Sequence, residues 1–217
     1  MDPLDVVSAK TRRAYNLAAQ RYHDLFHDEM REKAYDRALL DRFAGHFDAG
    51  SLVCDAGCGP SGHIGRYVWE KGVPVLGVDI ADRCVALARR HNPAMRFVQG
   101  DLGALGFAAG VFDGIIAYYS IIDTPKDSVG RLFREFHRVL RPGGRLLVSV
   151  KAGATEGYLT ELLGTETEIW FSLFDREEIR RYFEAAGFAL ELLEQRCPLD
   201  FEINAERIFA IGRRDQR

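Results

Sequence analysis

Short apolar runs alternate with amphipathic stretches through the middle of the chain. The runs are bounded by Gly, Pro or Asp and have the length and composition of buried strands: SLVCDAG (51–57), VPVLGVD (73–79), MRFVQGD (95–101), FDGIIAYY (112–119) and GGRLLVSV (143–150). Between them apolar residues recur at helical spacing, most clearly over 126–140, ahead of RPGG. Strands that alternate with helices predict a parallel sheet covered on both faces, with a ligand crevice beyond the carboxyl ends of the strands.

The N-terminal part of the chain is predicted to be helical. One helical stripe runs through residues 8–28 and carries Tyr15 and Tyr22, and a second helix is expected over about 30–47. These helices predict an N-terminal helical cap over residues 1–48, in front of a sheet core over 49–150.

After residue 150 the periodic spacing of apolar residues weakens, and it becomes clear again from residue 175. The segment KAGATEGYLTELLGTETE shows no strong period, which indicates a mobile lid or substrate segment over 151–174. The last part, 175–217, begins with DREEIRRYFEAAGF, whose D-x-x-E pattern predicts a capped helix that ends at Gly187. Strand-like runs at 188–196 and 206–212 then predict a terminal hairpin, which adds an antiparallel last strand to the sheet.

Composition and charge limit the classes of function. The chain has 217 residues, of which 47% are hydrophobic, and this predicts one domain with one sizeable core. Its net charge of −3 gives no reason to expect nucleic acid or an anionic membrane as partner. There is no N-terminal signal core and no apolar run near the roughly 18 residues that a membrane span needs, so we expect a cytoplasmic protein.

Cysteine and histidine do not form a metal or disulfide pattern. The four cysteines lack paired C-x-x-C spacing, and Cys54 and Cys58 are expected to be buried for their small size. His23 and His27 share a helix face, which is more typical of a solvated helix surface than of a metal site. We therefore predict no metal site.

The most informative motif is VCDAGCGPSG at residues 53–62. A strand ends at Asp55 and runs into Gly57 and Gly59, which permit a tight turn and a close approach of the backbone to a ligand. The next strand ends at Asp79, at the place where an acid can chelate the ribose hydroxyls of a nucleoside cofactor. A third strand ends at Asp101, so three acids lie at one edge of the predicted sheet; a helix cap at Asp79 and a turn-forming role for Asp101 are the structural alternatives.

These motifs resemble those of a known family. VCDAGCGPSG, GVDI, QGDL and VLRPGGRLLV are similar, in order and spacing, to the successive motifs of class I S-adenosylmethionine (SAM) dependent methyltransferases over roughly residues 10–212. The resemblance implies an α/β fold, a Rossmann-like three-layer sandwich with a seven-stranded, mostly parallel sheet whose last strand is antiparallel. It also implies SAM as cofactor, S-adenosylhomocysteine as product, and these cofactor-binding residues: Tyr15, Tyr22, Asp55, Gly57, Cys58, Gly59, Asp79, Ile80, Asp101, Leu102 and Tyr118.

A nicotinamide-dependent dehydrogenase is the main rival for a glycine-rich turn followed by a distal acid. Asp55 lies two residues before the first glycine, where its charge would repel a pyrophosphate but attract the ammonium group of SAM. The sequence therefore favours the methyltransferase. Tyr15 and Tyr22 resemble aromatic positions that close over the cofactor, although residues of a core stripe would show the same spacing.

The segment YYSIIDTP (118–125) follows the fourth strand and faces the acceptor in this interpretation. Asp123 stands where related small-molecule enzymes often have His, so it is predicted to be a base or a substrate ligand, with a helix cap ahead of Pro125 as the alternative. One of Tyr118 and Tyr119 should face the crevice, and period two does not say which. We predict Asp123 and Tyr119 as catalytic residues.

Candidates for substrate binding lie at the ends of later segments. They are Tyr119, Asp123, Lys151 at the end of the fifth strand, Tyr158 and Trp170. The resulting hypothesis is a small-molecule N, O or C methyltransferase, active as a monomer or homodimer. A SAM-binding protein without transferase activity, or an enzyme that methylates protein or RNA, is the alternative; no N-P-P-Y segment follows the fourth strand and no basic surface is evident, which disfavours the latter.

Overall fold

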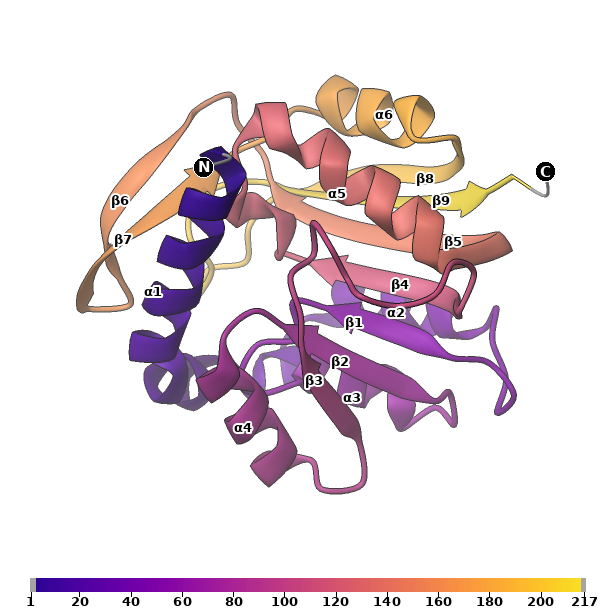
Figure 1. The fold of residues 1–217 in the computed structure, drawn as a ribbon, viewed down its shortest axis with the longest axis horizontal. Helices are drawn as coiled ribbons and strands as arrows, with labels where there is room; N and C mark the ends of the chain where they lie inside the picture. Colours follow the sequence, from indigo (N-terminus) through magenta and orange to yellow (C-terminus); the bar gives the residue numbers. More distant parts are fainter. Residues whose placement is uncertain (1–2, 216–217) are drawn as a thin grey trace.

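A seven-stranded sheet runs through the centre of the computed structural model, which describes residues 3–215 (Figure 1). Its order is β3-β2-β1-β4-β5-β9-β8, and β9 is antiparallel to both of its neighbours. The strands are β1 (Val53–Ala56), β2 (Val75–Asp79), β3 (Arg96–Gln99), β4 (Phe112–Tyr118), β5 (Leu140–Lys151), β8 (Phe188–Arg196) and β9 (Arg207–Arg214). The predicted mostly parallel sheet with an antiparallel last strand is confirmed; residues 1–2 and 216–217 of the predicted domain lie outside the described part.

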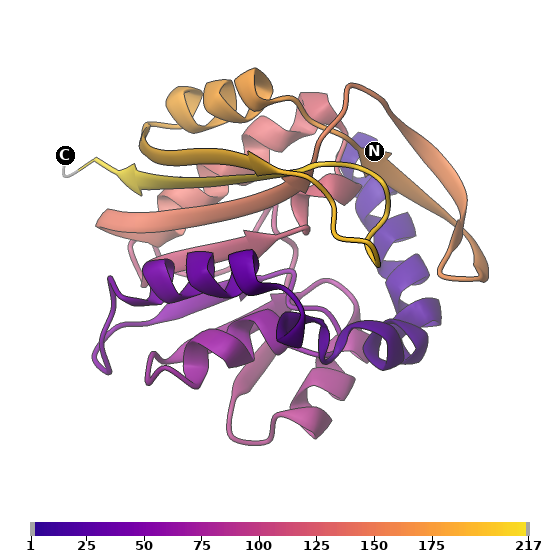
Figure 2. The same ribbon diagram turned by 180° about the vertical axis from the view of Figure 1, so that it is seen from behind.

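Helices cover both faces of the sheet and complete three layers. Two lie on one face, α5 (Lys126–Val139) and α6 (Arg176–Ala185), as Figure 1 shows. On the other face lie α2 (Ala34–Ala44) and α3 (His63–Trp69), seen from behind in Figure 2, and side chains of α4 (Asp82–His91) join the same core cluster.

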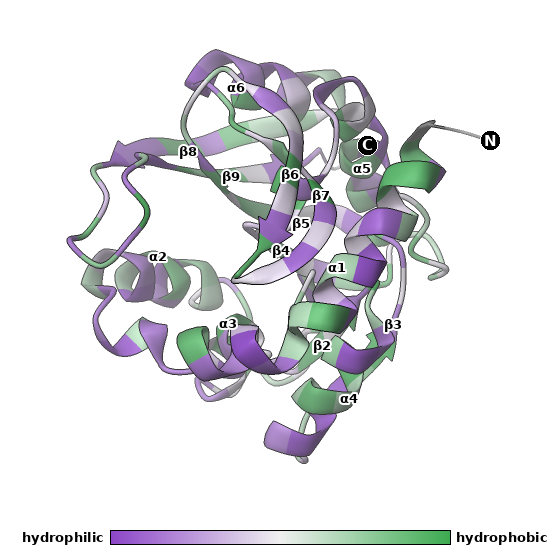
Figure 3. Cartoon of the chain, turned by 90° about the vertical axis from the view of Figure 1, so that its left-hand side faces the viewer, coloured by the Kyte–Doolittle hydropathy of each residue, from purple (hydrophilic) through white to green (hydrophobic). Residues whose placement is uncertain are grey.

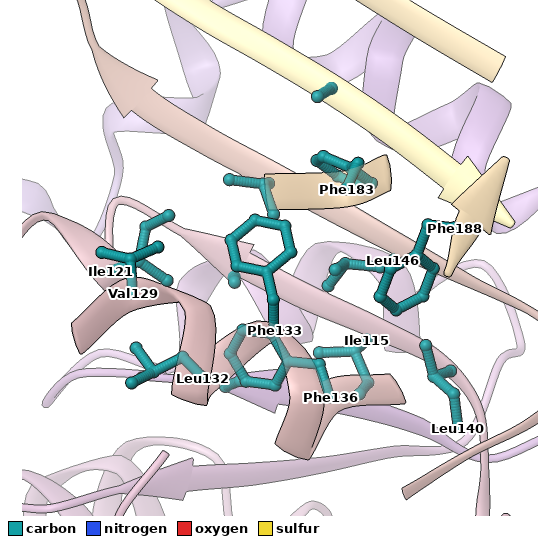
Figure 4. Close-up of a cluster of buried hydrophobic side chains, with 14 of the residues drawn as sticks. Ile115, Ile121, Val129, Leu132, Phe133, Phe136, Leu140, Leu146, Phe183 and Phe188 are labelled. Carbon is teal, nitrogen blue, oxygen red and sulfur yellow. The ribbon is translucent and has the colours of Figure 1, made fainter. Parts of the chain in front are cut away.

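The core on the α5 face explains why the helical spacing at 126–140 was so clear. The apolar residues of α5 at that spacing are buried, and Phe133 and Phe136 pack over Ile115 of β4 (Figure 4). Burying one such side chain stabilises the fold by roughly 1.5–3 kcal/mol. This layer fixes the ends of β4 and β5, where the acceptor side of the crevice was predicted.

The N-terminal helices have different positions, and only the first is a cap. Helix α1 (Pro3–Phe26) lies across the carboxyl edge of the sheet against α4 and β7, whereas α2 packs on the sheet face through Leu39, Leu40 and Phe43. The predicted second helix is also shorter than 30–47, because a short 3-10 turn, η1 (Glu29–Arg31), precedes it and Gly45 follows its last residue.

Residues 151–174 are not the irregular segment that the sequence indicated. They form a two-stranded antiparallel hairpin of β6 (Glu156–Leu162) and β7 (Thr165–Ser172), outside the main sheet. Most of its side chains are at least partly exposed, so no apolar alternation marked the strands. Its turn uses Leu163 at φ +53° and Gly164 at φ +78°, and Leu at such a position hides the usual Asn-Gly or Asp-Gly signal.

The C-terminal part follows the prediction closely. Glu178 N–H donates to Asp175 Oδ1 at 2.7 Å and Asp175 N–H donates to Glu178 Oε2 at 2.8 Å, which is the predicted capping box. Figure 3 looks at the carboxyl edge of the sheet, with α1 and the β6–β7 hairpin in front of it. The loop between β8 and β9 lies at the same end, as Figure 2 shows. Three segments distant in sequence therefore meet where the parallel strands end.

Candidate active site

A cleft of about 740 Å³, part of it open to solvent, lies beneath α1 at the carboxyl edge of the sheet. Its volume is within the roughly 300–1,000 Å³ of typical ligand sites. The cleft brings together most of the predicted site residues: Tyr15, Tyr22, Gly57, Gly59, Asp79, Ile80, Asp101, Leu102, Tyr118, Tyr119 and Asp123.

The turn after β1 is held by backbone hydrogen bonds and by a close contact. The N–H groups of Gly57 and Cys58 donate to the carbonyl of Val78, at 2.8 and 3.0 Å. Gly57 has a φ of +83°, and a Cβ at this position would lie 2.2 Å from the Cβ of Ser120. Glycine is therefore required here both by the backbone conformation and by the approach of the segment that follows β4.

The acids after β2 and β3 are held in place by backbone N–H groups. Asp79 is 7% exposed and accepts hydrogen bonds from the N–H groups of Gly59 and Ala81, each at 2.9 Å. Burial raises the pKa of Asp79 to about 6, and these two bonds lower it in part. Asp101 accepts a bond of 2.7 Å from the N–H of Gly103. Both carboxylates line the cleft and retain lone pairs for a ligand.

Asp55 and Cys58, two of the predicted cofactor residues, are buried and lie outside the cleft lining. The Asp55 carboxylate is 2% exposed and accepts a 3.0 Å bond from the N–H of Gly65 in α3. Burial raises the pKa of Asp55 to about 7. The Cys58 side chain packs in the core cluster beneath α2 and α3. Asp55 therefore ties α3 to the end of β1.

Helix α1 contributes more of the lining than the two predicted tyrosines. Leu4, Ser8, Thr11, Tyr15 and Tyr22 all face the cleft, at spacings of four, three, four and seven residues. The Thr11 hydroxyl is buried and has no hydrogen-bond partner among the described residues. Extending the stripe from Tyr15 back by one and two turns would have found Thr11 and Ser8, which the sequence analysis missed.

Tyr118, the last residue of β4, and the next residue Tyr119 both line the cleft, although strict strand alternation would place them on opposite faces. Tyr119 has a φ of +55°, so the strand alternation ends there and its side chain joins that of Tyr118 on the cleft side. The Tyr118 hydroxyl donates to Asp36 of α2, whereas the buried Tyr119 hydroxyl makes no hydrogen bond of good geometry with any residue that the structure describes. Burial raises the pKa of Tyr119, and the nearby Ser149 hydroxyl lowers it in part. A left-handed non-glycine residue at a cleft is typical of a functional site.

Asp123 is not a helix cap. It is the last residue of a 3-10 turn, η2 (Ile121–Asp123), and α5 begins after Pro125 with no side-chain cap bond. Its Oδ2 accepts a 2.8 Å hydrogen bond from the Tyr15 hydroxyl, which joins α1 to the acceptor edge. Burial raises the pKa of Asp123 to about 7, while the Tyr15 bond and the charge of Lys151 lower it.

Three predicted substrate residues do not line the cleft. Tyr158 is exposed on β6, where its ring meets Trp170 edge-on at 4.9 Å and lies under the Lys10 ammonium at 4.2 Å. The Trp170 indole donates to the Ser172 hydroxyl at 3.0 Å. The hairpin of β6 and β7 lies outside the main sheet. These contacts hold its two strands together and attach it to α1. Lys151 is half-buried at the end of β5, next to Asp123 but outside the cleft lining.

The charge of the cleft fits the cofactor implied by the motifs. Among the residues that the structure describes, its lining holds three carboxylates, of Asp79, Asp101 and Asp123, and no basic side chain. Such a site suits a ligand with a sulfonium and an ammonium group and disfavours a pyrophosphate. The buried hydroxyls of Thr11 and Ser120, which have no hydrogen-bond partner within residues 3–215, supply further polar groups at its wall.

Two further observations apply to residues 3–215. No group of three or more His, Cys, Asp or Glu side chains is arranged to hold a metal ion. No helix in this range combines the length and the apolar character needed to cross a membrane.

Comparison with known sequences shows that the glycine turn and the acids at the strand ends lie within a known domain family. A methyltransferase-domain family model matches residues 54–148. The malonyl-[acyl-carrier protein] O-methyltransferase of Enterobacter lignolyticus (strain SCF1) is 32% identical over 194 residues, which cover 88% of this chain and 70% of that protein. The demethylmenaquinone methyltransferase of Beutenbergia cavernae is 32% identical over 151 residues, 68% of this chain and 58% of that protein. The matches thus span 58% to 70% of the length of these relatives.

Solved structures of low sequence identity share the fold. The Burkholderia thailandensis 1,6-didemethyltoxoflavin-N1-methyltransferase, with bound 1,6-didemethyltoxoflavin and S-adenosylhomocysteine, superposes with a TM-score of 0.74 at 21% identity, over 99% of this chain and 92% of that one. The Synechocystis magnesium protoporphyrin IX methyltransferase with bound SAM gives 0.72 at 16% identity, over 96% and 97%.

Proposed function

The chain belongs to the class I SAM-dependent methyltransferases, and from that membership we propose that it methylates a small organic acceptor held at the Tyr119–Asp123 edge of the cleft. One observation carries the proposal. A single cleft joins the ends of β1, β2 and β3, which present the cofactor acids, to the end of β4, which presents Tyr119 and Asp123.

Three turns, one after each of β1, β2 and β3, bind different parts of the cofactor. Asp79 binds the ribose hydroxyls, and Asp101 with the backbone of Leu102 binds the adenine. The turn of Gly57 and Gly59 lies against the amino acid part, close enough because neither residue carries a side chain. What supports these roles is the position of the carboxylates in the lining and their free lone pairs.

The protein's main task is alignment. SAM, when bound, supplies a methyl group on a sulfonium sulfur that a nucleophile can displace in line. Holding the acceptor in that line can lower the barrier by about 7–11 kcal/mol. Tyr119 and Ser120 at the wall of the cleft position the acceptor, and α1 above it keeps water out.

Asp123 is the general base in this proposal. Its carboxylate takes the proton that a hydroxyl or amine acceptor loses on methylation. A pKa of about 7, raised by burial, combines partial ionisation at neutral pH with a useful affinity for the proton. Tyr15 holds Oδ2 in place and leaves Oδ1 for the acceptor.

The names of similar proteins support the class of acceptor. They refer to malonyl-[acyl-carrier protein], demethylmenaquinone, 1,6-didemethyltoxoflavin and magnesium protoporphyrin IX. Both O and N1 methylation occur in these names. The proposal therefore specifies a small organic acceptor group and not its atom.

Two measurements test the proposal. Calorimetry should detect binding of SAM and of S-adenosylhomocysteine to the purified protein; no heat with either would overturn it. Incubation with SAM and fractionated cell extract should then give a small molecule heavier by one methylene unit. Methylation confined to protein or RNA fractions, or cofactor binding with no product in any fraction, would support the alternative functions.

A further inference from the structure

A buried charge cluster lies behind Tyr119, on the α2 side of the sheet. It joins side chains from η1, α2, the end of β5 and the loop between β8 and β9, segments that are far apart in the sequence. Its Lys and Arg members are Lys33, Lys151, Arg196 and Arg207, and its carboxylates are Glu29, Asp36 and Glu202.

Glu202 is the centre of this charge cluster. Arg196 Nη1 lies 2.6 Å and Lys33 Nζ 3.2 Å from its carboxylate, and Arg207 Nε lies 3.8 Å away. Lys33 also pairs with Glu29 at 2.8 Å, and Arg196 with Asp36 at 2.8 Å. Each of these three basic side chains therefore has at least one carboxylate within 4.0 Å.

Lys151 is the member left without such a partner. Among the described residues no carboxylate lies within 4.0 Å of its ammonium group, although the side chain is half-buried. Burial lowers the pKa of Lys151, and the charge of Asp123 opposes this. A partly buried cation with no ion pair needs a compensating anion or water.

The position of Lys151 connects it to the acceptor edge. In the ladder of β5 and β9 it lies opposite Arg207, so both side chains project from the same face of the sheet. Ser149, two residues earlier on that face, accepts a backbone hydrogen bond of 2.9 Å from Tyr119. The Tyr119 ring lies 5.9 Å from the Arg207 guanidinium and 5.7 Å from the Lys33 ammonium.

We propose that Lys151 and the Tyr119 hydroxyl form an anion subsite, and that the methyl acceptor carries a carboxylate which binds there. This rests on the proposed function, because it assumes an acceptor at the Tyr119–Asp123 edge. The Tyr119 hydroxyl, buried and without a hydrogen bond of good geometry, donates to one carboxylate oxygen, and the ammonium of Lys151 pairs with the group.

The count of charges favours a carboxylate over a phosphate. Among residues 3–215, Lys151 is the one cation of the charge cluster without an ion pair. Arg196 donates through both Nη atoms to Glu202, and Arg207 donates from Nη1 to two backbone carbonyls. The adjacent Asp123 would repel a dianion more strongly than a monoanion. A single negative charge is what this arrangement compensates.

Two exposed apolar side chains lie on the loop that leads into Arg207, the residue opposite Lys151 in the β5–β9 ladder. Phe201 and Ile203 are 54% and 67% exposed on the loop between β8 and β9, and the Ile203 carbonyl accepts a bond from Arg207. Straight-chain alkanoates can place a carboxylate at Lys151 and a chain along such a surface. Butanoate, hexanoate and octanoate, each paired with its amide, are therefore suitable probes.

The test measures binding of these pairs to protein saturated with S-adenosylhomocysteine, by calorimetry or ligand-observed NMR. We expect at least one alkanoate to bind about tenfold or more tightly than its amide, as a charge-assisted contact predicts. Lys151→Gln should abolish the difference and Lys151→Arg should largely keep it. Lys71→Gln, which removes an exposed lysine paired with Asp41 far from the cleft, is the matched control and should change nothing.

The outcomes separate this inference from the proposed function. Absence of binding by every alkanoate, equal binding of acid and amide, or a preference that survives in Lys151→Gln would overturn the carboxylate subsite. Normal binding of S-adenosylhomocysteine in the same samples would leave the methyltransferase proposal intact. Loss of cofactor binding in the unmodified protein would instead contradict the proposed function itself.

Discussion

The two sides of the cleft are built in different ways. The cofactor side uses the ends of β1, β2 and β3 and is fixed by backbone groups, such as the N–H of Gly59 that bonds Asp79. The acceptor side is fixed by side chains from distant segments, such as Glu202, which pairs with Lys33 across the molecule. The first arrangement is encoded locally, and the second depends on tertiary packing.

This difference predicts how each side responds to substitution. A change on the cofactor side should reduce SAM affinity and leave the rest of the fold intact. A change in the buried charges should reduce stability or acceptor use and leave SAM affinity nearly unchanged. The predictions below test this separation, from the largest expected effect to the smallest.

Gly57→Ala should cause the largest loss. Its Cβ would lie 2.2 Å from the Cβ of Ser120, at a φ of +83° that disfavours alanine, so either the turn after β1 or the segment after β4 has to move. We expect SAM affinity to fall by at least about 1000-fold, or ~4 kcal/mol. Calorimetry with SAM, together with circular dichroism to check folding, measures this.

Gly59→Ala is the matched control for this effect. Gly59 also has a positive φ, +61°, but its Cβ would lie 3.8 Å from the Tyr22 ring, an ordinary contact. Only the backbone strain of about 1–2 kcal/mol remains, which corresponds to about tenfold. Equal losses in the two variants would mean that the contact with Ser120 is not what requires glycine at position 57.

Glu202→Gln should destabilise the acceptor side. The substitution removes the carboxylate that pairs with Arg196 at 2.6 Å. Arg196 and Lys33 keep their second partners, Asp36 and Glu29, but the buried Arg207 loses its ion pair. A loss of about 3–5 kcal/mol in the free energy of unfolding is expected. Urea denaturation measures the loss, and SAM affinity of the folded variant should stay within about twofold of the parent. A large loss of SAM affinity would show that the two sides are not separable.

Asp79→Ala and Asp123→Asn should separate binding from turnover. Asp79→Ala removes the ribose contacts and should weaken SAM binding by about 30- to 100-fold, or ~2–3 kcal/mol. Asp123→Asn should lower kcat by about 100-fold, through loss of the base, with SAM affinity changed little. Calorimetry and steady-state kinetics with the identified acceptor provide both readouts. The opposite ordering would mean that the two ends of the cleft have been assigned the wrong way round.

The same contrast explains what the sequence could predict. The positions of the strands, the terminal hairpin and the acids at Asp79 and Asp101 follow from periodicity and local motifs, because residues close in sequence determine them. The motifs also resembled a family whose order of strands is known, so the fold could be predicted nearly whole. The confirmed capping box at Asp175 is equally local.

The structure differs from the predictions where the deciding contacts are not visible in the local sequence pattern. Asp55 was predicted to contact the cofactor, whereas its carboxylate is buried outside the cleft lining and accepts a hydrogen bond from the N–H of Gly65 in the next helix. The β6–β7 hairpin lies on the surface, so its strands bury no regular face, and its turn carries Leu163 where Asn or Asp usually stands. Asp123 does not cap α5, and its hydrogen bond with Tyr15, 108 positions away in the sequence, is a tertiary contact that the local pattern does not contain.

The pH dependence of turnover should show the smallest and most diagnostic effect. If Asp123 is the base, kcat rises with pH through about 7, as its carboxyl ionises. Tyr15→Phe removes a hydrogen bond that stabilises the carboxylate, so this limb should move to higher pH. Tyr22→Phe, which alters the same face of α1 without touching Asp123, should leave the limb in place and serves as the control.

The stability of the ligand-free protein provides an independent check on Asp123. Its pKa is about 7 in the folded chain and about 3.9 when unfolded, so folding favours the protonated form. The stability that this provides is complete below about pH 4 and is lost as the pH rises through about 7. Because Asn resembles the protonated acid, Asp123→Asn should melt at the same temperature as the parent at pH 4 and at a higher temperature at pH 8. The other buried acids are present in both proteins, so they do not contribute to the difference. Equal melting temperatures at pH 8 would mean that ionisation of Asp123 does not destabilise the fold and that burial does not raise its pKa.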